Sequence, residues 1–85
     1  MPKLTTIGEE AFANCRNLSV VRLPKTLTHV LKNAFEDDHN LREVTVEPGA
    51  NFVCKCVLLA EKLKKITDVR VDLEGPGTYR IKALV

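Results

Sequence analysis

The residues with the clearest capacity for chemistry are three cysteines and two histidines. Cys54 and Cys56 lie two positions apart, so in an extended segment both thiols face the same side, and thiolates are good zinc ligands. Cys15, His29 and His39 complete a site only if the fold gathers them, and the chain has no second C-x-C or C-x-x-C pair. We therefore predict no metal and no cofactor, and we interpret the cysteines as small buried apolar residues.

Catalytic roles for the histidines are equally poorly supported. His39 follows Asp37 and Asp38, which are carboxylates able to orient an imidazole, but ordinary turn chemistry explains that segment. No Ser or Thr stands on a glycine-flanked elbow, and Glu-Gly-Pro-Gly at 74–77 is too short for a phosphate-binding loop. We predict no catalytic residue and no small-molecule substrate, and that the protein is not an enzyme.

Length and charge exclude several other classes of function. The chain has 85 residues, of which 45% are hydrophobic, and a net charge of +2. A chain this short forms one small domain without room for a large enclosed active site. The chain contains no charge-free run of about 18 residues, so we predict no membrane span. The small net charge does not favour nucleic acid as a partner. A protein partner or a larger protein complex remains.

The expected compartment is intracellular. The first residues lack the apolar stretch of a signal peptide, and three cysteines are an odd number that does not suggest a disulfide framework. The alternative is the cell surface, if the chain is a fragment of a longer secreted protein.

The most informative feature is an internal repeat. Seven residues of the first half, six of them apolar, recur in kind after 23 positions. The pairs are Leu4 and Leu27, Ile7 and Val30, Ala11 and Ala34, Phe12 and Phe35, Asn17 and Asn40, Leu18 and Leu41, and Val21 and Val44. A period of this length is typical of stacked architectures, in which each unit buries its apolar side against the next.

Each full unit contains the pattern L-x-x-V-x-L/V, at 18–23 and again at 41–46. Its spacing directs the first, fourth and sixth residues into a core and predicts short parallel strands. The connections should hold a second extended segment at 27–30 and a helical turn from Asn33 to Phe35. Phe12 and Phe35 should stack inside the core.

The third unit is degraded. Val53 stands 23 positions after Val30 and is its expected equivalent in the next unit. However, the continuous apolar stretch at 52–59 and the residues after it favour a helix from Cys54 to Lys64. We expect Val57, Leu58 and Leu63 to face inward on this helix. After it, period-two alternation at 69–73 and 78–84 around the Gly-Pro-Gly segment predicts a β-hairpin.

The residues that carry the period closely resemble the BspA-type leucine-rich repeat, whose unit reads roughly I-G-x-x-A-F-x-x-C-x-x-L-x-x-V-x-L-P. Ile7 to Pro24 follows this pattern, residues 4–48 match it well and residues 51–71 loosely. In the second unit Leu31 replaces the Gly of the pattern and Asp38 replaces the Cys. The resemblance implies a curved solenoid of the kind found in bacterial and protist surface proteins, used for adhesion and for host, matrix or cell contact, without catalysis.

The predicted fold is therefore a β-rich α/β repeat: a short leucine-rich-repeat solenoid with parallel strands, short helical turns and a C-terminal β-hairpin. We expect a single domain over 1–85. Its repeats should cover about 4–26 and 27–49, followed by a degraded repeat at 50–71 and a capping hairpin at 69–85.

The function that follows is a non-enzymatic protein–protein interaction module, because the strand side of a solenoid is a rigid extended platform. The predicted partner-binding residues lie on or beside the outward side of the strands: Val20, Arg22, Arg42, Glu43, Thr45, Lys64, Lys65 and Thr67, with Ser19 at their border. The alternative is a small structural subunit permanently embedded in a larger assembly.

A second cluster is basic and comprises Lys62, Lys64, Lys65 and Arg70. We interpret it as a solvated helix face, with phosphate or an acidic partner as the alternative.

Overall fold

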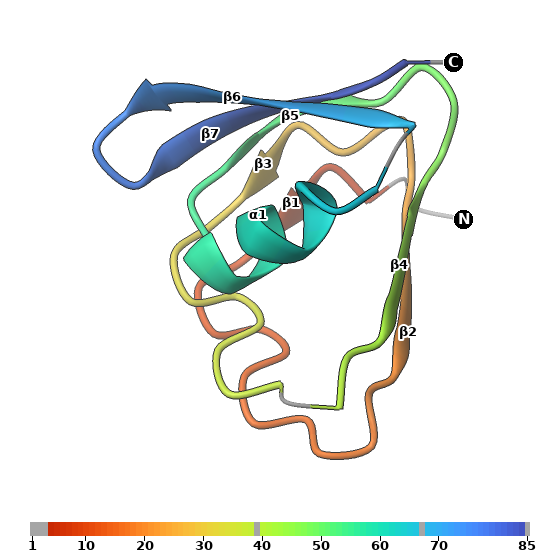
Figure 1. Ribbon diagram of the computed structural model, residues 1–85. Helices are drawn as coiled ribbons and strands as arrows, with labels where there is room; N and C mark the ends of the chain where they lie inside the picture. Colours follow the sequence, from red (N-terminus) through yellow and green to blue (C-terminus); the bar gives the residue numbers. More distant parts are fainter. Residues whose placement is uncertain (1–3, 39, 67, 85) are drawn as a thin grey trace.

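Strands from successive units of the chain build two sheets. The structure is a computed structural model that describes residues 4–38, 40–66 and 68–84. The elements, in chain order, are β1 (Thr6–Ile7), β2 (Val20–Leu23), β3 (His29–Val30), β4 (Glu43–Val46), β5 (Asn51–Cys54), α1 (Val57–Leu63), β6 (Val69–Gly75) and β7 (Thr78–Ala83). One sheet has the order β1-β3-β5-β7-β6 and the other consists of β2 and β4. Figure 1 shows the β2–β4 pair along one side of the molecule and the β6–β7 hairpin at its top.

Parallel pairing follows the 23-residue period. β2 pairs with β4 in parallel, with Val21 opposite Val44, and β1 pairs with β3 in parallel, with Ile7 opposite Val30. The parallel strands predicted at 18–23 and 41–46, and the extended segment predicted at 27–30, are confirmed. The next step is 24 residues, because Val30 lies opposite Cys54 and not Val53. One additional residue before Pro48 accounts for the shift.

The connections between the strands stack in the same way, but they are not helical. Between 31 and 41 the backbone makes successive hydrogen bonds to the residue three before, for example Glu36 N–H to the Asn33 carbonyl at 3.1 Å. Asn33 has a φ of 59° and Asp37 a φ of 61°, and this left-handed backbone interrupts any helix. The helical turn predicted at Asn33 is therefore wrong. Glu10 and Asn14 repeat the two left-handed positions one period earlier.

The core lies between the sheets and includes Phe35, Phe52, Leu27 and Val30, which are fully buried. Phe12 and Phe35 stack with ring centroids 5.3 Å apart and planes 10° from parallel, as predicted. Phe12 is nevertheless 39% exposed, so the expectation that both rings lie inside is wrong for Phe12. Among the described residues, no further unit covers the outer side of its ring.

The third unit departs from the prediction at its start. Cys54 ends strand β5, and helix α1 begins only at Val57. Residues 51–54 stay extended because they pair on one edge with β3 and on the other with β7. The inward face of α1 consists of Leu59, Ala60 and Leu63, whereas Val57 is 51% exposed and Leu58 is half-buried. The inward orientation is confirmed for Leu63 and in part for Leu58, which packs against the core, and it is wrong for Val57.

The predicted hairpin is confirmed and has an additional role. β6 and β7 pair antiparallel, with Leu73 opposite Tyr79, and Gly77 supplies the positive φ of the turn. β7 also pairs antiparallel with β5, where Ile81 lies opposite Phe52. The five-stranded sheet is therefore mixed, and the hairpin satisfies the edge that β5 would otherwise expose. The result is a β-rich repeat fold with one short helix; none of the described helical residues forms a helix long and apolar enough to cross a membrane.

The two stacked rings give a stability prediction. Phe35→Ala should lower the free energy of unfolding by about 3–5 kcal/mol, because it opens a cavity in the core, and Phe12→Ala by clearly less, because much of that ring already contacts solvent. Urea unfolding followed by circular dichroism measures both. If Phe35→Ala does not fold, Phe35→Leu is compared instead. Equal losses at the two positions would contradict the asymmetry of the stack.

Candidate functional site

The outward side of β2 and β4 gathers four of the predicted partner-binding residues. Val20 lies opposite Glu43, and Arg22 lies opposite Thr45. All four are exposed, whereas Leu23 and Val44 on the same strands are buried. Side chains alternate along a strand, so the parallel register aligns the outward ones. We call Val20, Arg22, Glu43 and Thr45 the strand face.

Ser19 and Arg42 border this face. The Ser19 carbonyl accepts hydrogen bonds from the backbone N–H groups of Arg42 and Glu43, at 2.9 and 3.0 Å. The bonds hold the start of β4 against the start of β2. The exposed Arg42 therefore lies directly before β4, at the end of the strand face that Val20 and Glu43 begin.

The third row of this face does not form. Lys65 was expected to continue the alignment, but β4 pairs only with β2 among the described residues, and β6 joins the other sheet. Helix α1 ends at Leu63, and the chain after it is held by the hairpin end, where the Asp68 carbonyl accepts a hydrogen bond from Leu84 N–H at 2.8 Å. The predicted alignment of Lys65 is therefore wrong. Thr67 lies outside the described residues.

Lys64 points toward the hairpin and not toward the strand face. Its ammonium forms an ion pair with Glu61 at 3.1 Å and lies 5.2 Å from the centroid of the Tyr79 ring. The hydrogen bond to Glu61 raises the pKa of Lys64. Both partners are well exposed, so the pair contributes little to stability.

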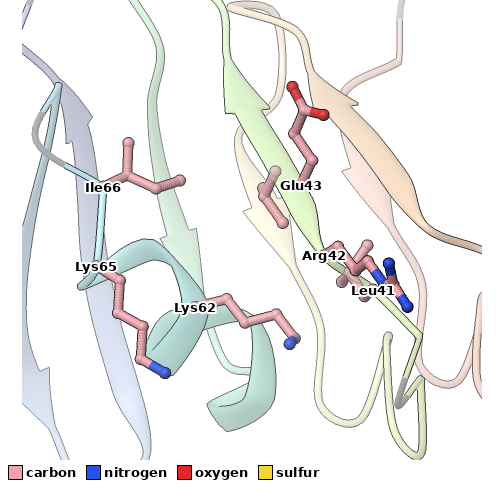
Figure 2. Close-up of a pocket in the computed structure, with 7 residues that line it drawn as sticks. Leu41, Arg42, Glu43, Lys62, Lys65 and Ile66 are labelled. Carbon is pink, nitrogen blue, oxygen red and sulfur yellow. The ribbon is translucent and has the colours of Figure 1, made fainter.

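A cavity of about 520 Å³ lies beside β4, where Lys65 was expected to continue the strand face. Glu43 and Val44 line it from β4, together with Leu41 and Arg42 just before that strand. On the other side it is lined by Lys62 of α1 and by Lys65 and Ile66, which follow the helix. Figure 2 shows the Lys62 side chain extending from α1 toward β4. Sequence reasoning found the basic residues of α1 but missed their approach to Arg42. The fading of the period after Val46 was the signal that β4 would lack a second neighbour.

The cysteines and histidines do not form a chemical centre in the described part of the chain. The Cys54 thiol donates to the Cys56 carbonyl at 3.3 Å, and burial raises the pKa of Cys54 to about 12. The thiol is therefore protonated at neutral pH, whereas a metal ligand or nucleophile would be a thiolate. Cys15 is half-buried in the first connection, and His29 is exposed on β3. His39 lies outside the described residues, and the remainder hold no group of three or more potential ligands.

Asp38 is the buried charged residue that remains, and its contacts are structural. The side chain is fully buried, and its Oδ1 accepts a hydrogen bond from Cys15 N–H at 2.8 Å, which joins the connections of the first two units. Oδ2 has no hydrogen-bond partner among the described residues. The carboxylate therefore bridges two repeats with one oxygen and is unsatisfied at the other.

Comparison with protein-family models matches residues 1–70 to the BspA type leucine-rich repeat region, which that model describes as six copies. The search of curated proteins and the search of solved structures found no match.

The buried thiol predicts a pH dependence. Cys54 is protonated in the folded chain up to about pH 12 and ionises near pH 9.0 when unfolded, so its contribution to stability is complete below pH 9 and is lost as the pH rises toward 12. The slope from this one group is about 1.4 kcal/mol per pH unit. Urea unfolding between pH 8 and 11 should show a weaker decline for Cys54→Val. If the free energy of unfolding declines equally with pH in the unaltered chain and in Cys54→Val, the predicted contribution of this thiol is wrong.

The unsatisfied oxygen of Asp38 predicts a destabilising substitution. Asp38→Asn keeps an acceptor for Cys15 N–H, but it places two amide donors where Oδ2 has no partner among the described residues, so the free energy of unfolding should fall by about 1–3 kcal/mol. Asp68→Asn, at an exposed position, is the matched control and should leave stability unchanged. Unchanged stability in Asp38→Asn would contradict the absence of a hydrogen-bond partner at this position.

Proposed function

Because the chain belongs to the BspA-type leucine-rich repeat family, we propose that it is a non-enzymatic protein-interaction module that binds another protein through the strand face. The observation that carries the proposal is the parallel register of β2 and β4, which presents Val20, Arg22, Glu43 and Thr45 on one side. Adjacent strands held by backbone hydrogen bonds are already ordered, so they lose little conformational entropy on binding. A rigid surface of this kind suits binding to the surface of another protein.

The composition of the strand face supports a specific partner. It combines an apolar side chain, a cation, a carboxylate and a hydroxyl, and Val20 is 56% exposed. Arginine is enriched at protein interfaces because its planar guanidinium donates several hydrogen bonds. A partner needs an apolar contact for Val20 and opposite charges for Arg22 and Glu43.

The finer architecture belongs to the same proposal. The parallel stacks β1–β3–β5 and β2–β4 are two sides of a short solenoid, and the hairpin closes its C-terminal end. Pairing of β7 with β5 supports this arrangement. An adhesion role rests on the family resemblance. An intracellular location is proposed from the free thiols of Cys15, Cys54 and Cys56, which a reducing compartment keeps unpaired; a cell-surface location is the alternative.

A second candidate function is a structural subunit of a larger assembly. The first unit leaves Leu4, Phe12 and Val20 exposed, and β1 is an edge strand of its sheet. Such an apolar side with open edges is what a permanent neighbour would cover. The candidates differ in what they require: the module folds alone, whereas the subunit needs its neighbour.

The first experiment separates these candidates. The purified 85-residue chain should be monomeric and unfold in one cooperative thermal transition, because the described residues already form a buried core and a paired hairpin. Sedimentation and calorimetry measure this. A chain that stays unfolded or aggregated until a partner is added would support the assembly subunit and contradict the independent module.

The second experiment tests the strand face. Arg22→Glu combined with Thr45→Lys should abolish capture of those proteins that the unaltered chain retains from a lysate, because the cation of the strand face becomes a carboxylate and its neutral hydroxyl becomes a cation. Lys82→Glu on the exposed side of β7 is the matched control and should retain them. Equal melting temperatures confirm that both variants fold. Identical capture by both variants would contradict a role for the strand face.

A further inference from the structure

We propose that the free edge of β4 binds an acidic peptide segment of the partner in extended conformation, which adds to the sheet as a third strand. This inference rests on the proposed function and names the chemistry of the partner. It concerns the edge of β4 and the cavity beside it, whereas the strand face is the outward side of the same strands.

The backbone of β4 leaves one edge open. The N–H groups of Glu43 and Glu47 donate to the carbonyls of Ser19 and Leu23, at 3.0 and 2.9 Å. Alternate residues of a strand direct their backbone groups to opposite edges. The N–H and C=O of Val44 therefore point away from β2, as do those of Val46, and no described strand pairs with them.

Space for a further strand lies at this edge. The cavity of about 520 Å³ is bounded on one side by residues of β4 and on the other by Lys62, Lys65 and Ile66. An unpaired edge with room beside it is the site at which extended peptides add to a sheet, through alternating N–H and C=O groups. Leu41, Val44 and Ile66 in the cavity lining offer apolar contacts for alternate side chains of such a peptide.

The charge of the lining determines the partner. Arg42, Lys62 and Lys65 contribute three cations, and Glu43 contributes one carboxylate. None of the three cations forms an ion pair with another described residue, whereas the neighbouring Lys64 is paired with Glu61. The excess of positive charge favours a carboxylate-bearing segment. A second copy of this chain would bring the same cations to the edge and is repelled.

The test uses a synthetic hexapeptide in which Glu and Val alternate. A matched peptide carries Lys in place of Glu. Two further peptides are N-methylated, one at every Glu and one at every Val, so that each loses hydrogen bonding along one edge. Titration into the isotopically labelled 85-residue chain, followed by NMR, reports affinity and the amides that respond.

The Glu peptide should bind saturably, shift the amide resonances of Val44 and Val46, and slow their hydrogen exchange. The Lys peptide should not bind, and one of the two N-methylated peptides should lose binding. Lys62→Gln with Lys65→Gln should weaken the Glu peptide about three- to tenfold at low salt. Lys25→Gln with Lys82→Gln removes two exposed lysines that do not line the cavity and should leave affinity unchanged.

Three outcomes would overturn the inference: no binding of the Glu peptide, equal binding of the Glu and Lys peptides, or equal binding of both N-methylated peptides. The proposed function is judged separately, by the effect of Arg22→Glu with Thr45→Lys on partner capture. If that capture is lost while the peptide fails to bind, the strand face stands and the edge of β4 is excluded.

Discussion

Backbone register between successive units is the constraint on which the rest of the structure depends. In stacked repeats, equivalent residues of parallel strands lie opposite one another only when they recur at a nearly constant spacing, since each N–H must find the matching carbonyl of its neighbour. Here the spacing is 23 residues for Ile7 and Val30 and for Val21 and Val44. The connections obey the same rule, because Phe12 N–H donates to the Ala34 carbonyl at 2.8 Å. Side-chain stacking and the alignment of the strand face follow from this backbone match.

The third unit breaks the register on one side only, and that asymmetry creates the cavity beside β4. In the five-stranded sheet β5 keeps the parallel pairing with β3, and β7 covers its other edge. In the smaller sheet no described strand follows β4. Helix α1 brings Lys62 toward the uncovered edge (Figure 2), so a basic cavity stands where a regular repeat would have placed a strand. Buried Leu59 and Leu63 anchor the helix to the core while its Lys62 lines the cavity.

The strand face and the edge of β4 offer different kinds of recognition. The face presents side chains whose identity can change without altering the backbone, so it supports specificity. The edge presents N–H and C=O groups that bind any extended chain, and selectivity there comes from the surrounding cations. Arg42 lies between the two surfaces, since it borders the strand face and also lines the cavity beside β4. A partner that uses both surfaces would contact the outward side chains of β2 and β4 and also the backbone edge of β4.

The period and the apolar positions within the sequence determined the family, the strands of the first two units, the hairpin and the outward set Val20, Arg22, Glu43 and Thr45. These features depend on the spacing of residues along the chain, which the sequence alone defines. Tertiary structure alone decided that Cys54 remains extended and that the helix begins only at Val57, because two neighbouring strands hold β5 despite the apolar run that favoured a helix from Cys54. It also decided that Lys65 lies at a cavity and not in a third row. Which edges are filled depends on contacts between distant segments, and such contacts leave no periodic trace in the sequence.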